Sequence, residues 1–363
     1  MSERVASPRR ALRIVILGVE VKGTKGGAEV LIEKLETALL ERGHHVERVL
    51  IPFIAEPKQN LVEQMHVWRS LELERVVGKE IDLVIATKFP SYLVRHPRKI
   101  TWLIHQHRQL YDLYDSRFGD FSTSTVDEAI RQLVAQTDLV ALTECMERYT
   151  ISARVGERLR RYHGLESRVI MPPLPLSGRY RAERADNYLL YVGRVCSIKR
   201  VDLIIKALPM IDESLTLHIV GIADEPGVQE FLDSEIAKHH LHHRVQFLGR
   251  VDDEELLSLY AKCFAVFYAP YDEDYGFVTL EAMASGKPVI TATDSGSVLD
   301  FVRDGVNGLS VQPIEKMIAD GINLLFSDRA LYQSLCDRAA VTQLPSSWEA
   351  IASTFEQIAE SHN

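Results

Sequence analysis

The chain has 363 residues, 46% of them hydrophobic, and a formal net charge of −9. A chain of this length can form two domains with a core in each, and its acidic balance argues against nucleic acid as a partner. No apolar segment approaches the ~20 residues of a membrane-spanning helix. Four scattered cysteines without CxxC spacing are typical of a reduced, cytoplasmic protein.

Short apolar segments alternate with amphipathic helical patterns in the first half of the chain, which predicts a parallel sheet with helices on both faces. We expect strands at 12–18, 45–51, 81–87, 99–105 and 137–143. Residues 148–163 are predicted to form a helix that ends at Gly164. A segment rich in proline and polar residues follows at 171–187 and is typical of a linker between domains.

The same alternation restarts after the linker, with strands expected at 187–195, 215–222, 244–250, 264–270 and 287–293. Residues 346–361 have the apolar spacing of an amphipathic helix. The sequence therefore predicts two α/β domains, at 1–173 and 174–345, followed by a C-terminal segment at 346–363.

A glycine-rich turn, GTKGGAE at 23–29, follows the first expected strand and opens a helix. Gly26 and Gly27 would let backbone amides approach an anion closely at a helix N-terminus. Such a turn on its own is as often a tight connection as a ligand loop.

Two cations follow the strand that begins the second half. The strand ends at Gly193, Arg194 comes next, and Lys199 lies on the loop into a helix. Ligands of open α/β sheets bind beyond the carboxyl ends of the strands. We therefore expect Arg194 and Lys199 to neutralise a diphosphate there, although surface charge at a helix start is the alternative. The sequence gives Arg200 no role.

The segment 270–290, PYDEDYGFVTLEAMASGKPVI, holds two glutamates eight positions apart, Glu273 and Glu281. We expect Glu273 on a loop, Glu281 in the next helix, and the amides of that helix start facing a phosphate. The helix is expected from Val278 onward, and the candidate donor-binding residues around its start are Gly276, Phe277, Val278 and Thr279. A carboxylate for sugar hydroxyls beside amides for phosphate suits a nucleotide-sugar site.

Two histidines, His105 and His107, end or follow the expected strand at 99–105. Either could bond a sugar hydroxyl or relay a proton, and the alternative is a structural histidine at a strand end. The histidine-rich stretch 239–243 lacks nearby carboxylate or cysteine ligands, so no metal site is predicted.

The spacing Glu273-x7-Glu281 followed by AMASGKPVI resembles the signature of the retaining glycosyltransferases of family 4. This resemblance implies the GT-B architecture, two facing Rossmann-like domains with a C-terminal helix that crosses back to the first domain. It implies that the second domain binds a nucleotide-diphosphate sugar, with Arg250 and Val251 near the base, and that the first binds the acceptor. It also places His105 at the transferred sugar and the glycine turn in the cleft.

The implied reaction is retaining transfer of a sugar from a UDP- or GDP-linked donor to a hydroxyl group, without cofactor or metal. Glu273 would contact the transferred sugar and Glu281 the donor ribose. The acceptor would be a carbohydrate or lipid-linked, as in polysaccharide or glycolipid synthesis. A nucleotide-sugar 2-epimerase and a non-catalytic sugar-nucleotide-binding subunit are the alternatives, and Tyr271-Asp272 after Pro270 departs from the family pattern and leaves the donor sugar open.

A basic stripe is expected on a helix of the first domain, where it could dock on the inner face of a membrane. Its residues are Arg154, Arg158, Arg160 and Arg161. The alternative, which the sequence supports equally well, is an ordinary helix face in contact with solvent. The expected location is therefore cytoplasmic, with peripheral membrane association as an option.

Overall fold

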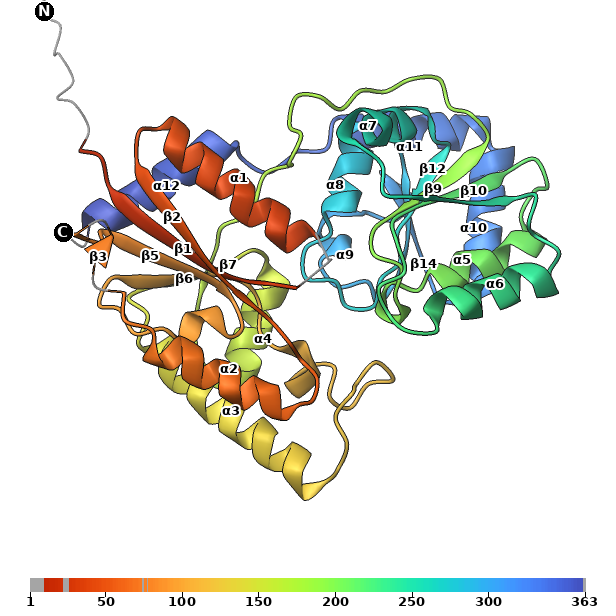
Figure 1. Cartoon of the computed structure of the whole chain (residues 1–363). Helices are drawn as coiled ribbons and strands as arrows, with labels where there is room; N and C mark the ends of the chain where they lie inside the picture. The colour runs from red at the N-terminus through yellow and green to blue at the C-terminus, as the bar shows by residue number, and fades with distance from the viewer. Residues whose placement is uncertain (1–9, 22–25, 74, 77, 362–363) are drawn as a thin grey trace, which may run out of the picture. The chain divides into compact units, whose positions relative to one another are not determined.

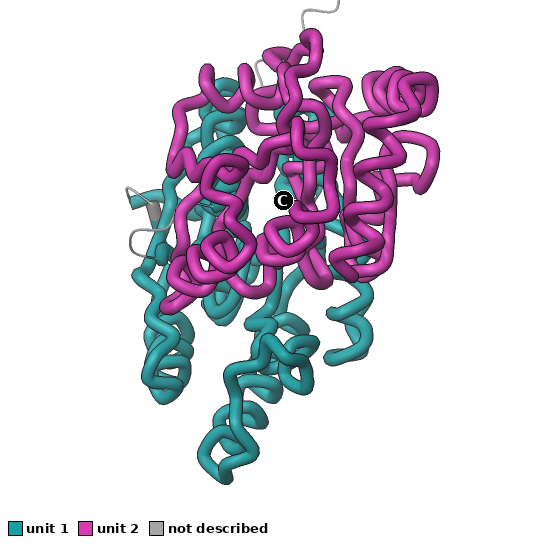
Figure 2. Tube along the Cα trace, turned by 90° about the vertical axis from the view of Figure 1, so that its right-hand side faces the viewer, with its two compact units in different colours: residues 1–172, 346–363 teal, residues 173–345 magenta. Residues whose placement is uncertain are grey.

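The computed structural model describes residues 10–21, 26–73, 75–76 and 78–361. The chain divides into two compact units, the first formed by Met1–Pro172 with Ser346–Asn363 and the second by Pro173–Pro345 (Figure 2). Each unit is built on one parallel sheet of six strands. In the described residues, no helix is long and apolar enough to cross a membrane.

The sheet of the first unit has the strand order β2-β1-β5-β6-β7-β8 (Figure 1). Its strands are β1 (Arg13–Glu20), β2 (His45–Pro52), β5 (Leu83–Lys88), β6 (Lys99–His105), β7 (Arg148–Thr150) and β8 (Arg168–Val169). A separate antiparallel pair consists of β3 (Arg75–Val76) and β4 (Lys79–Glu80). Because the strand order reverses direction between β1 and β5, a crevice for ligands is expected beyond the carboxyl ends of these two strands.

Helices cover both faces of this sheet, with α1 and α12 on one face and α2 and α3 on the other (Figure 1). They are α1 (Gly27–Glu41), α2 (Gln59–Ser70), α3 (Thr125–Thr143), α4 (Ala153–His163) and α12 (Trp348–Ser361), with 3-10 turns η1 (Ser91–Leu93) and η2 (Arg108–Leu110). The strand predicted at 137–143 is wrong, because these residues end α3. A short apolar run fits a buried strand or a helix equally well, and here Asp138, Ala141 and Leu142 face the core at helical spacing.

The helix predicted at 148–163 begins later than expected. Residues 148–150 form β7, and α4 starts only after Ser152, whose hydroxyl accepts from the Val155 amide at 3.2 Å. A serine at this position satisfies one of the free amides of the first turn and so fixes where the helix begins.

The C-terminal helix α12 belongs to the first unit and packs on α1. Phe355 lies against Trp102, with ring centroids 5.3 Å apart. Glu356 accepts bonds of 2.6 Å from Arg42 and from the His44 ring. Together with the two parallel sheets, this contact confirms the predicted fold class.

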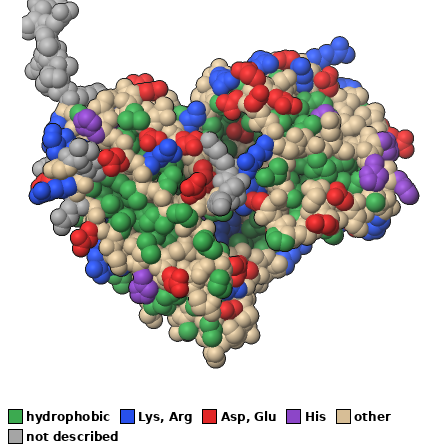
Figure 3. Space-filling view, in the orientation of Figure 1, with side chains coloured by type: hydrophobic (Ala, Val, Ile, Leu, Met, Phe, Trp, Pro, Cys, Tyr) green, Lys and Arg blue, Asp and Glu red, His purple; other side chains and the backbone are tan. Residues whose placement is uncertain are grey.

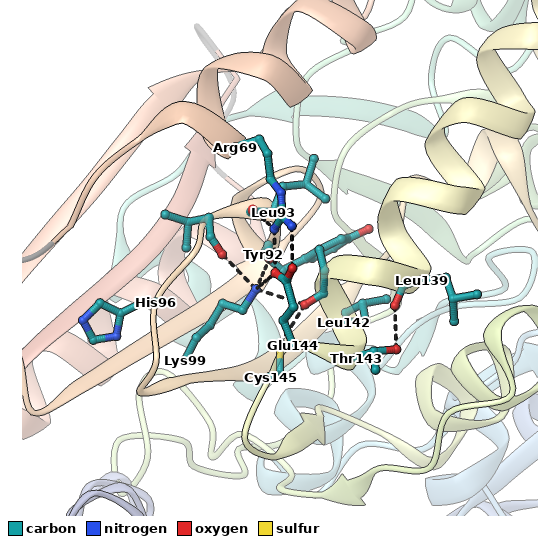
Figure 4. Close-up of polar contacts among 12 residues, drawn as sticks. Arg69, Tyr92, Leu93, His96, Lys99, Leu139, Leu142, Thr143, Glu144 and Cys145 are labelled. Carbon is teal, nitrogen blue, oxygen red and sulfur yellow. Dashed lines mark hydrogen bonds and ion pairs between the residues drawn. The ribbon is translucent and has the colours of Figure 1, made fainter.

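A buried lysine joins three elements of the first unit (Figure 4). Lys99 is fully buried, and its Nζ donates to the carbonyl oxygens of Tyr92 and Val94, each at 2.8 Å, and of Ala141 at 3.0 Å. Burial lowers the pKa of this ammonium group. Beside it, Arg69 pairs with Glu144 at 2.6 Å. Lys99 thereby ties β6 to η1 and to the end of α3.

The sheet of the second unit has the order β11-β10-β9-β12-β13-β14. Its strands are β9 (Tyr188–Val192), β10 (Thr216–Val220), β11 (Val245–Gly249), β12 (Ala265–Phe267), β13 (Val289–Ala292) and β14 (Gly308–Val311). Its helices are α5 (Val201–Ala207), α6 (Val228–Lys238), α7 (Asp253–Lys262), α8 (Phe277–Ala284), α9 (Val298–Phe301), α10 (Glu315–Ser327) and α11 (Arg329–Ala340), with turns η3 (Ser197–Lys199) and η4 (Leu208–Met210). The strand order reverses between β9 and β12, so the ligand crevice is expected there.

Candidate active site

A lysine, a glutamate and a tyrosine meet beyond the carboxyl ends of β9 and β12. Lys199 ends η3 and forms an ion pair with Glu273 through Oε2. The hydroxyl of Tyr268 donates to the same Oε2 at 3.0 Å and accepts from Lys199 Nζ at 3.2 Å. The side chains of Lys199 and Glu273 are 15% and 16% exposed, so the pair is shielded but can still be reached by a ligand.

The backbone fixes Glu273 firmly in the loop before α8. Its amide donates to Ser295 O at 3.3 Å, and its carbonyl accepts from the Ser297 amide at 3.0 Å. Gly296, between these two partners, has φ +61°, and a Cβ there would lie 2.5 Å from Glu273 N. Only glycine allows this close approach without a shift of the loop.

Arg200, which the sequence left without a role, fastens the loop that leads to Glu273. Its guanidinium is buried and donates to Ala269 O at 2.7 Å and to Pro270 O at 2.8 Å. It also forms a bidentate pair with Asp294 at 2.9 and 2.7 Å. Because the guanidinium of Arg200 already bonds to these carbonyl and carboxylate oxygens of its own unit, we assign Arg200 a structural role and no contact with a substrate.

Arg194 lies where three strand ends come together. Gly221 has φ +136°, and a Cβ there would lie only 1.8 Å from Gly193 O. Its amide also donates to Gly249 O at 2.7 Å. The Arg194 side chain is 48% exposed and donates to Asp224 at 3.0 Å. Arg194 therefore has a fixed backbone and a guanidinium group that can reach a ligand.

Helix α8 begins at Phe277, one residue before the predicted start at Val278, and follows Gly276, whose φ is +86°. Its first turn holds Phe277, Val278 and Thr279, and the Thr279 amide donates to Gly276 O at 3.0 Å. Glycine offers no side chain to cap the other amides of this turn, which suits an anion as their partner.

Glu281 lies inside α8, 8% exposed, and two tyrosines hold it. Its Oε1 accepts from the Tyr180 hydroxyl at 3.2 Å and its Oε2 from the Tyr260 hydroxyl at 2.7 Å. Burial raises the pKa of this carboxyl group, while the two phenols act against that rise. Glu281 is thus oriented by phenols, whereas Glu273 is paired with a cation.

Arg250 and Val251 follow β11 on the same unit. Arg250 is exposed, and Val251 packs against the core beside α7 and α8. Their predicted contact with the nucleotide base stays a prediction.

The first unit places a second polar group beyond the ends of β1, β5 and β6. Residues 23–25 of the glycine turn lie outside the described residues, but the Gly26 amide donates to Glu29 at 2.9 Å. Glu29 also pairs with Lys88 at 2.6 Å, and Lys88 lies opposite His105 in the sheet register. Burial would raise the pKa of Glu29, but Lys88 and the Gly26 amide outweigh it and the pKa is lowered. Gly27 begins α1.

The two candidate histidines differ in their surroundings. The His105 ring lies 2.7 Å from Gln106 O. The His107 ring lies between Phe53 and Phe89, at centroid distances of 5.9 and 5.4 Å. Burial, helped by the charges of His105 and Lys58, lowers the pKa of His107 to about 3. His107 is therefore neutral at pH 7. Which of the two histidines contacts the transferred sugar stays a prediction.

The prediction of a basic stripe on α4 is wrong for one of its four residues, Arg158. Arg158 is 4% exposed and lies 3.6 Å from Asp112, because it points into the unit and not into solvent. Arg160 is exposed but pairs with Glu166 at 2.8 Å. On the face shown in Figure 3, acidic and basic side chains are interspersed.

Four functional candidates escaped the sequence analysis: Tyr268, Asp224, Lys88 and Glu29. Each forms its contact with a residue far away along the chain or in a different element, which a local pattern does not reveal. The available signal was a polar residue at the end of an apolar strand, as in IDLVIATK for Lys88 and FAVFY for Tyr268. Among the described residues, no cluster of three or more His, Cys, Asp or Glu side chains could hold a metal ion.

Comparison with known proteins agrees with this geometry. The family model described as "Glycosyl transferases group 1" matches residues 178–343, nearly all of the second unit. The D-inositol 3-phosphate glycosyltransferase of Nocardia farcinica is 26% identical over 100% of this chain and 91% of its own. An uncharacterized glycosyltransferase of Methanocaldococcus jannaschii, MJ1607, is 30% identical over 46% of this chain, and the chain spans only 43% of that relative.

Solved structures match the fold along nearly the whole chain. The sucrose-phosphate synthase of Thermosynechococcus elongatus has a TM-score of 0.76 at 19% identity, covering 96% of this chain and 98% of that one. Anabaena HepE in complex with UDP-glucose has a TM-score of 0.68 at 20% identity, covering 96% and 99%. The fold is GT-B. The second unit of the chain is therefore similar to the glycosyl transferases group 1, whose family model matches it at residues 178–343.

Proposed function

We propose that the protein is a retaining glycosyltransferase that moves a sugar from a UDP- or GDP-linked donor to a hydroxyl group of an acceptor. One observation carries the proposal: Lys199, Glu273 and the uncapped start of α8 meet where the strand order of the second sheet reverses. A carboxylate for the sugar and cations with amides for a diphosphate are thereby within one site.

On the donor side, Arg194 and Lys199 bind the diphosphate, and the amides of Gly276, Phe277 and Val278 complete its cradle, with Thr279 next to them. Glu281 bonds the ribose, which fits its fixed orientation between two phenols. Arg250 and Val251 border the base. We expect no need for a divalent metal, since the two cations and the helix start can stabilise the charge of the departing diphosphate.

In the reaction, the bond between the sugar's anomeric carbon and the diphosphate oxygen breaks, and its electron pair leaves with the diphosphate. The acceptor oxygen forms the new bond on the same face, and its proton passes to the departing phosphate oxygen. Glu273 bonds the sugar hydroxyls and stabilises the positive charge that develops at the anomeric carbon. Lys199 stabilises the negative charge on the leaving group.

The first unit binds the acceptor. We assign the glycine turn with Gly26 and Gly27, and His105 or His107, to the acceptor and the transferred sugar. Relatives named D-inositol 3-phosphate glycosyltransferase and glycogen synthase support an acceptor rich in hydroxyl groups. Polysaccharide or glycolipid synthesis is the pathway that we propose.

A thermal-shift screen with UDP-, GDP-, ADP- and TDP-sugars identifies the donor, because a ligand at 100 times its dissociation constant adds about 2.7 kcal/mol to stability. The donor is then supplied with an acceptor panel, and NMR reads the anomeric configuration of the product. A retained configuration supports the proposal, and an inverted one contradicts it. Conversion of the donor without acceptor would instead indicate an epimerase, and loss of activity in EDTA would indicate a metal.

Two variants separate the roles of the glutamates. Glu273→Gln should lower kcat far more than it weakens donor binding, because its interaction is strongest in the transition state. Glu281→Gln should mainly raise the donor KM, because the ribose contact is the same in both states. Wild-type kcat in Glu273→Gln would contradict the proposed mechanism.

A further inference from the structure

Tyr268 lies in the hydrophobic core of the second unit and outside the segment from Glu273 to Glu281. It directly follows β12, is 4% exposed, and its hydroxyl lies in a closed triangle with Lys199 and Glu273. A Cβ on Gly276 would lie 3.4 Å from its ring, so Tyr268 also borders the start of α8. Its hydroxyl therefore lies among the groups that the proposed function assigns to the sugar and the diphosphate.

The triangle leaves Lys199 with two competing partners. Its ammonium now donates to Tyr268 and pairs with Glu273. A diphosphate carries more negative charge than one carboxylate, so a bound donor would compete with Glu273 for Lys199. Glu273, only 16% exposed, would then lose its cation where water can replace it poorly.

The Tyr268 hydroxyl is the group that can hold Glu273 through this exchange. It donates to Oε2 and is anchored by a buried ring, so it stays in place when the longer lysine side chain turns. In the described residues, both Lys199 and Tyr268 bond to Oε2, which leaves Oε1 as the oxygen that can turn to the sugar.

We propose that Tyr268 is a positioning residue of this site, whose hydroxyl keeps the Glu273 carboxylate aimed at the transferred sugar while Lys199 exchanges Glu273 for the donor diphosphate. The inference rests on the proposed function and deepens it. It assigns to Tyr268 an effect on turnover through Glu273, and no direct contact with the donor.

Tyr332 provides a matched control in the same unit. It is buried like Tyr268, stacks on Phe264 at a centroid distance of 4.4 Å, and donates to the Phe264 carbonyl at 2.8 Å. Its hydroxyl thus satisfies a backbone carbonyl of the core and touches no proposed site residue. Removing either hydroxyl should cost a similar amount of stability, so only the site role distinguishes the two.

The experiment compares Tyr268→Phe and Tyr332→Phe in the full chain, with the donor found by the screen. For Tyr268→Phe we expect kcat to fall about tenfold to a hundredfold, the range for one hydrogen bond to a charged group, with donor KM changed less than about threefold. For Tyr332→Phe we expect the wild-type kcat. Donor binding by calorimetry counts the folded sites, so kcat is expressed per binding site even if a variant is less stable.

Three results would overturn the role of Tyr268. The first two are a wild-type kcat in Tyr268→Phe and a raised donor KM with kcat unchanged. The third is a loss of kcat in Tyr332→Phe as large as in Tyr268→Phe, because the effect would then not be specific to the Tyr268 hydroxyl. If the wild-type protein transfers no sugar to any acceptor, the proposed function fails and this role fails with it. Wild-type transfer that Tyr268→Phe leaves intact removes the role of Tyr268 alone.

Discussion

Lys99 in the first unit and Lys199 in the second are both shielded lysines, but they have different kinds of partner. Lys99 donates to three backbone carbonyls, which cannot leave unless α3 or η1 unwinds. Its ammonium also lies 3.9 Å from the Glu144 carboxylate, which Arg69 holds in place. Lys199 bonds to the side chains of Tyr268 and Glu273, which can rotate. The comparison teaches that a buried cation held by backbone is committed to the fold, whereas one held by side chains is available to a ligand.

Their places in the sheets agree with this distinction. Lys99 begins β6, at the amino end of its strand, and Lys199 follows β9, beyond a carboxyl end. Ligands of open α/β sheets bind at carboxyl ends. The kind of partner and the end of the strand are independent observations, and both assign Lys99 to the fold and Lys199 to a ligand site.

The largest expected effect is on the stability of the first unit. Lys99→Met should lower the free energy of unfolding by roughly 3–5 kcal/mol, because three buried carbonyls lose their ammonium donor and Ala141 O keeps the weaker Cys145 thiol donor. Urea unfolding measures it. The control is Lys316→Met, whose 70% exposed side chain should change stability by less than about 0.5 kcal/mol. An unchanged unfolding midpoint in Lys99→Met would break the comparison.

Lys199→Ala should have the opposite effect: the stability of the fold should be kept, and binding of the donor should be weakened. We expect nucleotide-diphosphate binding to weaken by roughly 1.5–3 kcal/mol, the range for a hydrogen bond to a charged group, and the same for Arg194→Ala. Calorimetry with UDP and GDP measures it. Lys206→Ala, on α5 and paired with Asp202, is the control and should bind as the wild type does. Unchanged affinity in both site variants would mean that the diphosphate binds elsewhere.

A third prediction concerns His107, a partly buried group that is held neutral. The pKa of His107 is about 3 in the folded chain and about 6.5 when unfolded, so below pH 6.5 the unfolded state binds the extra proton. Stability is fully present above pH 6.5 and falls as the pH drops toward 3. At pH 5 this amounts to about 2 kcal/mol, since one pKa unit is about 1.4 kcal/mol.

The test is His107→Phe, which keeps an aromatic ring against Phe53 and Phe89 but cannot titrate. Between pH 7 and pH 5 the wild type should lose about 2 kcal/mol more stability than the variant in urea unfolding. His163, whose pKa burial lowers to about 4, is present in both proteins, so its effect cancels. Equal losses in the two proteins would show that His107 is not held neutral.

How far the sequence predicts this molecule depends on the distance between the interacting residues. The loop position of Glu273 and the start of α8 follow from local signals, a glycine and a change of periodicity. The error at 137–143 arises because seven residues with alternating chemistry fit strand and helix alike. The triangle of Lys199, Tyr268 and Glu273 joins residues up to 74 positions apart, so only the folded chain brings them together.

The smallest expected effect is on membrane association, because α4 exposes less positive charge than its sequence suggested. Arg158 is buried against Asp112, Arg160 pairs with Glu166 and Arg154 pairs with Glu157 at 3.3 Å, so little net positive charge remains on this helix face. Exposed charges act over about 8 Å at physiological ionic strength. We therefore expect co-sedimentation with anionic vesicles only at low salt, and its loss in a variant with Arg154→Glu and Arg161→Glu. Neutral vesicles are the control. Binding that survives both physiological salt and the double substitution would show that another surface docks on the membrane.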